Sequence, residues 1–170
     1  MSREARAEST RFRMIADIPS RTIKRPTGCD FTNPTSAEIP ALGQLMLAAY
    51  RGTPDEADAG TTIACATEEI RRVFDGKYGE LIQEASFVAH EDNRPIAVTL
   101  ITVWQGEPLL AYAFTAHSHT GQGVSRALIT ASINALAMRG HARLNLAVNE
   151  NNSRARKLYE SMGFRRSNAV

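Results

Sequence analysis

Apolar residues at helical spacing predict the first helix of the chain. Thr35 and Glu38 form a T-x-x-E pattern, which is typical of a helix start. Pro40 fits only in the first turn, where its missing N–H does little harm. We expect the helix to end near Tyr50, because Gly and Pro follow closely. The apolar positions that recur at this spacing are Ile39, Leu42, Leu45, Met46 and Ala49.

The middle of the chain changes from helical to strand periodicity. A second helix is expected from about Thr62 to Phe74, with Ile63, Ile70, Val73 and Phe74 on its inner side. Three β-like runs follow, at Ser86–His90, Ile96–Trp104 and Leu109–Thr115. Short turns separate these runs, so we expect antiparallel strands.

A helix, a strand and a helix complete the C-terminal third. The first helix is expected to stop before Gly140, with Val124, Ala127, Leu128, Ala131, Ala135 and Met138 on one face. The strand is expected at His141–Val148, where apolar and polar residues alternate. The last helix should run from about Ser153 to Met162, with Ala155, Leu158, Tyr159 and Met162 on its apolar face.

The N-terminal segment carries no sustained period. We expect a polar arm over residues 1–20, a short strand at Thr22–Arg25 and a turn at Cys29–Pro34. The predicted order is β-α-α-β-β-β-α-β-α, within a single domain that spans residues 21–170. Such an order favours an α/β (α+β) fold with a mixed, mostly antiparallel sheet and helices on both faces.

Composition and charge narrow the classes of function. Apolar residues make up 43% of the 170 residues, and 20 basic against 18 acidic residues give a net charge of +2. The apolar fraction argues against disorder. The near balance of charges argues against a nucleic-acid partner. No apolar run has the length of a membrane span, and the N-terminus lacks the apolar segment of a signal peptide, so we expect a soluble, cytoplasmic protein without a membrane partner. Cys29 and Cys65 have no metal-like spacing, and we expect idle thiols and no metal site.

The informative segment is TAHSHTGQGVS, Thr115 to Ser125, between a predicted strand and a predicted helix. Gly121 and Gly123 precede the helix, where backbone N–H groups have no partner inside it. Such a turn can hold a phosphate or pyrophosphate through its backbone alone. An isolated G-x-G can equally be a tight connection. The segment matches neither the phosphate loop of nucleotide hydrolases nor a dinucleotide fingerprint.

Two blocks resemble the GNAT family of N-acetyltransferases. Thr120-Gly121-Gln122-Gly123-Val124-Ser125 is similar to the family's acetyl-CoA loop, which usually reads Arg/Gln-Gly-x-Gly-Ile/Val-Gly/Ala. The stretch from Val148 to Phe164 matches the signature V-x-x-x-N-x-x-A-x-x-L-Y-x-x-x-G-F without a mismatch. Thr120 and Ser125 depart from the first pattern, and we expect the change at Thr120 to remove one contact to the cofactor.

The resemblance implies a binding site for acetyl-CoA (coenzyme A). It assigns the pyrophosphate to backbone amides from Gln122 to Arg126, with the Arg126 side chain as either a further contact or a surface residue. It places the pantetheine arm along the strand at Phe114 and Thr115, beside Asn152, which can also simply cap the last helix. The implied cofactor-binding residues are therefore Phe114, Thr115, Thr120, Gly121, Gln122, Gly123, Val124, Ser125, Arg126 and Asn152.

The same resemblance implies direct transfer of an acetyl group to an amine. Tyr159, which alone would be a core residue, takes the position of the acid that protonates the leaving thiolate. Glu107 is the candidate general base, although it can also be a solvent-exposed turn residue. Glu84 is its rival, a water-relayed base is an alternative, and His117 and His119 are expected nearer the phosphates.

The acceptor and the assembly are the least determined features. The acidic residues Asp55, Glu56 and Asp58 either attract a cationic amine or form a solvated loop. The acceptor is expected to be a small-molecule or peptide amine. Only six residues follow Phe164, so we expect an exposed sheet edge and a homodimer. A non-catalytic acyl-CoA-binding module and a nucleotide-binding fold unrelated to CoA are the alternatives.

Overall fold

One mixed sheet organises the molecule. The computed structural model describes residues 10–24 and 26–168. In this part of the chain eight strands form one sheet in the order β2-β4-β5-β6-β7-β1-β8, with β3 paired to β5. The strands are β1 (Arg11–Asp17), β2 (Asp30–Thr32), β3 (Glu80–Leu81), β4 (Phe87–Glu91), β5 (Arg94–Trp104), β6 (Glu107–Thr115), β7 (Arg143–Asn149) and β8 (Arg165–Arg166).

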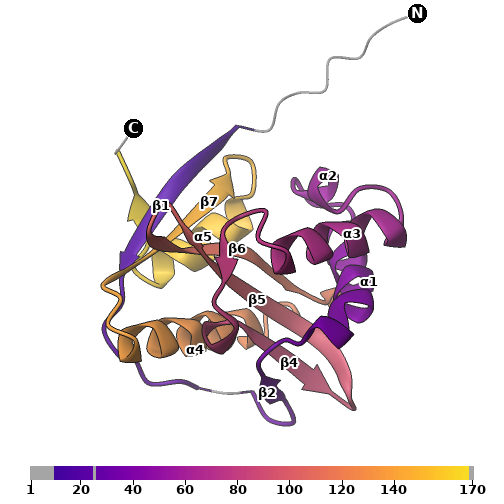
Figure 1. Cartoon of the computed structure of the whole chain (residues 1–170), viewed down its shortest axis with the longest axis horizontal. Coiled ribbons are helices and arrows are strands. Elements are labelled where there is room, and N and C mark those ends of the chain that lie inside the picture. Colours follow the sequence, from indigo (N-terminus) through magenta and orange to yellow (C-terminus); the bar gives the residue numbers. More distant parts are fainter. Residues whose placement is uncertain (1–9, 25, 169–170) are drawn as a thin grey trace, which may run out of the picture.

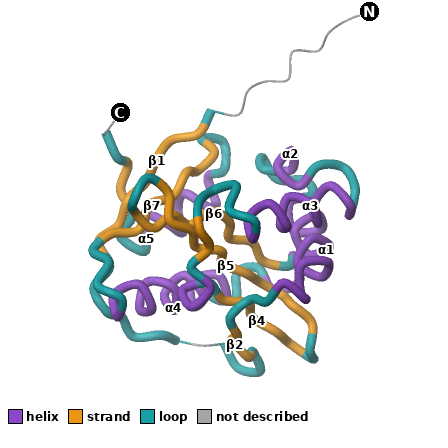
Figure 2. The backbone as a smooth tube through the Cα atoms, in the orientation of Figure 1, coloured by secondary structure: helices purple, strands orange, loops and turns teal. Residues whose placement is uncertain are grey.

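Helices cover both faces of this sheet, as the sequence predicts (Figure 1). Figure 2 shows α1 and α3 on one side and α4 on the other. The helices are α1 (Ile39–Tyr50), α2 (Glu56–Ala59), α3 (Ile63–Phe74), α4 (Val124–Met138) and α5 (Ser153–Ser161). None of the helices in the described ranges is long and apolar enough to cross a membrane.

The buried residues divide between the two faces. One core cluster joins α1 and α3 to the central strands through Leu42, Met46 and Ile70. The other packs Ile129, Ile133 and neighbouring α4 residues against β6, β7 and β1. Burial of these apolar side chains is the main stabilising contribution, at about 25 cal/mol for each Å² removed from water.

A β-bulge in β6 decides which side chains face which helices. Leu100 of β5 pairs with Tyr112, but the next residue, Ile101, pairs with Leu110, so Ala111 has no partner on β5. Without an extra residue, Leu110 and Tyr112 would face the same side. With it, Leu110 packs in the α4 cluster and Tyr112 in the α1–α3 cluster.

The start of the chain departs from the sequence prediction. The first strand lies at Arg11–Asp17 instead of Thr22–Arg25, so these residues belong to the sheet and not to an arm. Arg11 and Arg13 alternate with Phe12 and Met14, but this alternation is short, and the carboxylates that pair with the two arginines, Asp55 and Glu107, lie far along the chain. Residues 1–9 and Arg25 lie outside the described residues. The segment Cys29–Pro34, expected as a turn, contains β2, which pairs with β4.

Two apolar residues were placed on the wrong face. Ile63 is 51% exposed because it is the first residue of α3, beyond the packed part of the helix. Met138 is 88% exposed because it ends α4, two residues past the last buried residue, Leu136. The other predicted positions that pack these helices are buried or half-buried.

Gly43 makes the close approach of α1 to α3 testable. A Cβ at this position would lie 2.5 Å from the Cα of Thr67 and 2.7 Å from its backbone nitrogen. Alanine is intrinsically better in a helix by about 1 kcal/mol, yet overpacking a rigid backbone contact costs about 1–3 kcal/mol. We expect Gly43→Ala to lower the free energy of unfolding by about 2 kcal/mol in urea denaturation.

Gln44→Ala is the matched control, because Gln44 is exposed on the same helix. It should leave the stability within about 0.5 kcal/mol of the wild type. If Gly43→Ala were as stable as Gln44→Ala, the close packing of α1 on α3 would be contradicted.

Candidate active site

The sheet opens between its two parallel strands. β6 and β7 pair only at Leu109 with Asn145 and at Leu110 with Leu146. Beyond these pairs the strands separate, so residues 111–115 and 147–149 have no partners across the gap. Buried backbone groups need hydrogen-bond partners, so this edge of β6 can accept an extended ligand.

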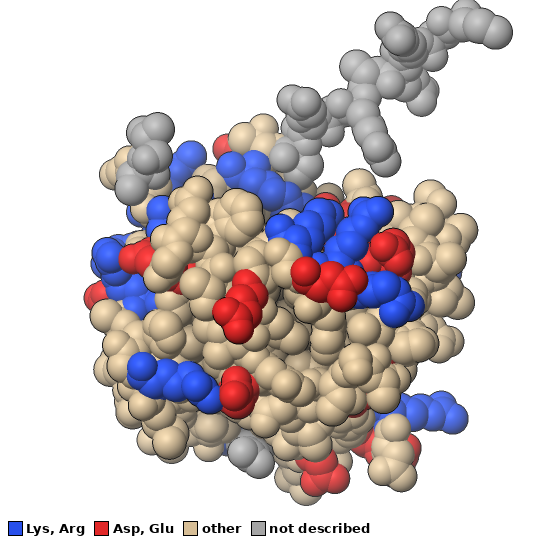
Figure 3. Space-filling model, viewed as in Figure 1, with Lys and Arg blue, Asp and Glu red and all other residues tan. Residues whose placement is uncertain are grey.

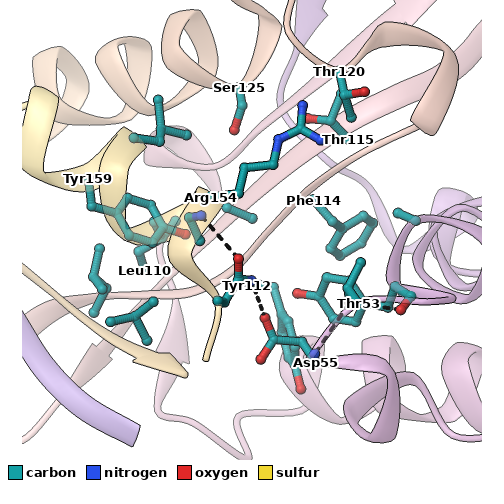
Figure 4. Close-up of a pocket in the computed structure, with 18 of the residues that line it drawn as sticks. Thr53, Asp55, Leu110, Tyr112, Phe114, Thr115, Thr120, Ser125, Arg154 and Tyr159 are labelled. Carbon is teal, nitrogen blue, oxygen red and sulfur yellow. Dashed lines mark hydrogen bonds between the residues drawn. The ribbon is translucent and has the colours of Figure 1, made fainter. Parts of the chain in front are cut away.

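A cavity of about 520 Å³ occupies this opening. Its wall is formed by the ends of β6 and β7, the start of α4, the face of α5, the end of α1 and the loop that follows α1. In Figure 4, Thr120, Ser125 and Arg154 lie toward one end and Thr53 and Asp55 toward the other, with Tyr159 and Phe114 between. The cavity therefore joins two ends of different composition.

The first end is built around the N-terminus of α4. Gly121 and Gly123 have φ of 76° and 80°, a left-handed conformation that favours glycine. The first intrahelical bond of α4 runs from Ala127 N–H to the Gly123 carbonyl, at 3.0 Å. No side chain of the described residues caps this end. Its N–H groups and the helix dipole are thus available to an anion.

Thr115 adds an unpartnered hydroxyl to this wall. Thr115 lines the cavity, and its buried Oγ1 has no hydrogen-bond partner among the described residues. Arg154, in the first turn of α5, likewise forms no hydrogen bond or ion pair within the described part of the chain. Its guanidinium points toward the end that Thr115 and Thr120 line (Figure 4). This end offers neutral and cationic donors to a phosphorylated ligand.

Tyr159 presents a protonated phenol to the middle of the cavity. The side chain extends from α5 into the cavity (Figure 4). Its ring packs against Phe164, with 5.7 Å between the ring centroids. Burial, with a smaller contribution from the charge of Asp55, raises the pKa of Tyr159 to about 12. The group is therefore fully protonated at neutral pH and can act as an acid.

Two carboxylates mark the second end. Arg11 donates through Nη2 to Asp55 Oδ1 at 3.0 Å and to Asp58 Oδ2 at 2.6 Å. Burial raises the pKa of Asp58, and the charge of Arg11 opposes this rise. Asn152 donates to Asp55 Oδ2 at 2.7 Å, and its own Oδ1 accepts the Ala155 N–H at 3.1 Å. Asn152 therefore caps α5 and ties the loop after α1 to it.

A buried carboxylate network fixes the aromatic floor of this end. Glu69 of α3 accepts hydrogen bonds from the hydroxyls of Tyr112 at 2.9 Å and Tyr78 at 2.5 Å, and from Lys77 at 3.0 Å. Hydrogen bonds from these three side chains outweigh the desolvation of Glu69, so the pKa of this carboxyl lies below its usual value. The network holds the Tyr112 ring in the cavity wall.

Comparison with known proteins decides the family. A sequence model described as an acetyltransferase (GNAT) domain matches residues 83–166, about half of the chain. The chain belongs to the GNAT acetyltransferase family. A search of curated protein sequences finds no match.

Solved structures share the GNAT fold at low sequence identity. A GCN5-related N-acetyltransferase from Sphaerobacter thermophilus has a TM-score of 0.72 at 15% identity, over 92% of this chain and 48% of that one. A ribosomal-protein alanine N-acetyltransferase from Escherichia coli has a TM-score of 0.63 at 23% identity, over 82% and 79%. PaiA N-acetyltransferase from Thermoplasma acidophilum, in complex with coenzyme A, has a TM-score of 0.65 at 14% identity, over 84% and 92%. The chain thus spans about half the length of the Sphaerobacter protein.

Most residues that the GNAT resemblance assigns to the cofactor lie in the cavity wall. These are Phe114, Thr115, Thr120, Gly121, Gly123, Val124, Ser125, Arg126 and Asn152. Gln122 does not line the cavity, because its side chain turns back to donate to the Ser118 carbonyl at 3.1 Å. The Arg126 guanidinium is engaged by the Ser161 hydroxyl at 2.6 Å.

The predicted base Glu107 lies outside the cavity of this GNAT domain. It accepts hydrogen bonds from Arg143 at 2.6 Å, Asn145 at 2.9 Å and Arg13 at 3.0 Å. The Asn145 bond and the two arginine charges hold the pKa of Glu107 below its usual value. This carboxylate is a cross-strand clamp on the sheet surface, so the structure does not support it as a base. Glu84 is also outside, beside Arg139.

The remaining candidates divide between the cavity wall and the outer surface. His117 and His119 line the cavity near the α4 end, as expected, and His119 contacts Glu91. Asp55 and Asp58 line the opposite end, whereas Glu56 is exposed and outside it. Arg11 carries no motif that marks it as a site residue, and its segment is predicted as an arm. Arg154 lay within the family signature at a position that the signature leaves open.

Asn152 provides a test of the link between α5 and the loop after α1. Replacing an N-cap residue by alanine costs about 1–2 kcal/mol, and here the bond to Asp55 is lost as well. We expect Asn152→Ala to lower the thermal midpoint by several degrees, which is about 1–2 kcal/mol for a domain of this size. Asn152→Ser keeps a capping oxygen but is too short to reach Asp55, so it should recover most of this loss. Equal destabilisation by both variants would contradict the capping role.

Proposed function

We propose that the protein transfers an acetyl group from acetyl-CoA directly to a primary amine. One observation carries the proposal: the strands β6 and β7 separate at the N-terminus of α4, and a protonated Tyr159 faces the resulting cavity. The family assignment supports acetyl transfer in general. The CoA donor, the amine acceptor and the direct route are our proposals.

The residues present fit coenzyme A. Backbone N–H groups from Gly123 to Arg126 would hold the pyrophosphate, because α4 leaves them without partners. The free edge of β6 at residues 111–115 would bond the amides of the pantetheine arm, with the orphan Thr115 hydroxyl beside it. Acetyl-CoA supplies the activated thioester when it is bound.

Tyr159 and the β6 backbone perform the chemistry in this proposal. The Tyr159 phenol donates its proton to the departing sulfur, for which a pKa of about 12 keeps it in the acid form. Unpaired backbone N–H groups of β6 stabilise the negative charge that develops on the acetyl oxygen. The neutral amine attacks directly, and the proton that its nitrogen releases as the amide forms restores the Tyr159 phenol. Neither Cys29 nor Cys65 is needed, and neither lines the cavity.

The phenol of Tyr159 can be tested by removing its hydroxyl. Tyr159→Phe should lower kcat by about a hundredfold, since a positioned general acid contributes about 10²–10⁴. The Kd for CoA should not change, because the ring and its contact with Phe164 remain. Thiol release with an amine panel measures kcat, and calorimetry measures the Kd.

Thr27→Val is the control, because it removes a hydroxyl from an exposed residue outside the cavity. Its kcat should equal that of the wild type. An unchanged kcat in Tyr159→Phe would refute the acid role. Absence of thiol release from the wild type with every amine would favour a non-catalytic acyl-CoA-binding module.

We propose that Arg154 makes the contact to the cofactor that is lost because Thr120 replaces the usual Arg or Gln. Both residues line the same end of the cavity, and Arg154 is the cation there with no partner among the described residues. A hydrogen bond to a charged group contributes about 1.5–3 kcal/mol, so Arg154→Gln should raise the Kd for CoA by about tenfold or more. Pantetheine lacks the phosphates, and its Kd should stay the same.

Lys157→Gln removes the same charge from an exposed position of α5 outside the cavity. It should leave both Kd values unchanged. Equal weakening of CoA and pantetheine by Arg154→Gln would show a role in the shape of the cavity and would contradict phosphate binding.

A further inference from the structure

The two ends of the cavity carry opposite charge. Arg126, Arg154 and the helix N-terminus give positive potential to the α4 end. At the other end lie Asp55 and Asp58, which are the only carboxylates among the described residues that line the cavity. If phosphates occupy the first end and the sulfur meets Tyr159, the acceptor must bind at the second.

The acidic end has one negative charge in excess. Arg11 is the only described cation near the two carboxylates, and it donates to both. Asp55 uses both oxygens, since Oδ1 accepts from Arg11 and Oδ2 accepts from Asn152. Asp58 uses only Oδ2, and its Oδ1 has no partner in the described part of the chain. Asp58 therefore has one acceptor atom left for a cationic ligand, and its side chain is 30% exposed.

Aromatic rings form the wall beside these carboxylates. Tyr50 lies 5.5 Å from Phe114 and 6.4 Å from Tyr112 between ring centroids, and all three line the cavity. Such rings bury the apolar body of a ligand and attract a cation at their faces. The Glu69 network fixes Tyr112 in place, so this wall is already formed.

The same geometry disfavours three other classes of amine. An amino acid would bring a third carboxylate to a site whose single guanidinium already serves two. A polyamine would bring two or more charges to one excess carboxylate, and an unpaired charge is costly to desolvate. A peptide needs an open groove, but the loop after α1 is fastened at this end to Asn149 through the Pro54 carbonyl and to Asn152 through Asp55.

We propose that the acceptor is a small primary amine with one positive charge and an apolar, preferably aromatic, body. Its ammonium group pairs with Asp58 Oδ1 on binding and then loses one proton to solvent, so that the neutral amine attacks the thioester. Its body lies against Tyr50, Tyr112 and Phe114. The proposal rests on the proposed acetyl transfer and adds the substrate class and a specificity residue to it.

The test compares amines that differ in one property each. We would measure kcat/KM by thiol release for 2-phenylethylamine, phenylalanine, spermidine and an alanine-initiated hexapeptide. Phenylalanine adds only a carboxylate to 2-phenylethylamine, so this pair isolates the effect of the third negative charge. We expect 2-phenylethylamine to exceed each of the others by about tenfold or more, the factor that corresponds to one mismatched charge.

The two proposals fail in different ways. Preference for phenylalanine, spermidine or the hexapeptide would overturn the inferred substrate class while upholding acetyl transfer. Thiol release with none of the amines, in a protein that still binds CoA, would refute acetyl transfer and the inference with it.

Asp58 is tested against a neighbour on the same short helix. Asp58→Asn should lower kcat/KM for 2-phenylethylamine by about tenfold, mainly through KM, with no change in the Kd for acetyl-CoA. Glu56→Gln removes an exposed carboxylate outside the cavity and should match the wild type. Wild-type kcat/KM in Asp58→Asn would overturn the role of Asp58. A parallel loss of acetyl-CoA binding would show a purely structural role and would overturn it too.

Discussion

The separation of β6 from β7 is the constraint on which the site depends. Two residue pairs hold the parallel strands together, and after Leu110 the backbone of each strand lacks its neighbour. Polar backbone groups seldom remain unpaired in a protein interior, so a sheet opened in this way is completed by a ligand. The crossover from β6 to β7 runs through α4, which brings the N-terminus of that helix to the wide end of the gap. One connection therefore brings together the helix terminus that we propose for phosphate and the strand edge that we propose for the pantetheine arm.

The other side of the gap is assembled from parts that are distant in the sequence. The bulge at Ala111 turns Tyr112 and Phe114 toward α1 and α3, while Leu110 faces α4. The loop after α1 is fastened by Asn152 and Arg11, which come from opposite ends of the described chain. Charges elsewhere are mixed: on the face shown in Figure 3, Lys and Arg lie beside Asp and Glu rather than in one basic patch. The polarity of the cavity is thus a local property of its two ends.

The sequence predicted the elements with strong periodicity and the site residues that belong to a contiguous motif. The helices α1, α3, α4 and α5 and the central strands lie where the apolar spacing puts them, and most residues of the glycine loop line the cavity. β1 was not predicted, because its polar–apolar alternation is short and the partners of its arginines lie far along the chain. The bulge at Ala111 shifts the register between β5 and β6, and no residue type in the sequence marks it. Glu107 was predicted as a base from its position at the start of a strand. Its pairing with Arg13 and Arg143 is visible only in the folded sheet, because these residues are distant in the sequence. The acceptor class, the homodimer and the cellular location stay predictions.

The use of main chain at one end and side chains at the other has a consequence for how such a domain can diverge. The grip on the donor resides in strand spacing and a helix terminus, which point mutations rarely erase. In the proposed function the selectivity of the opposite end depends on a few side chains, among them Asp58 and Tyr50, and each can be exchanged by one substitution. Random mutation would therefore change the acceptor specificity sooner than it would change the binding of the donor. This asymmetry makes the domain an economical starting point for laboratory evolution toward new amines.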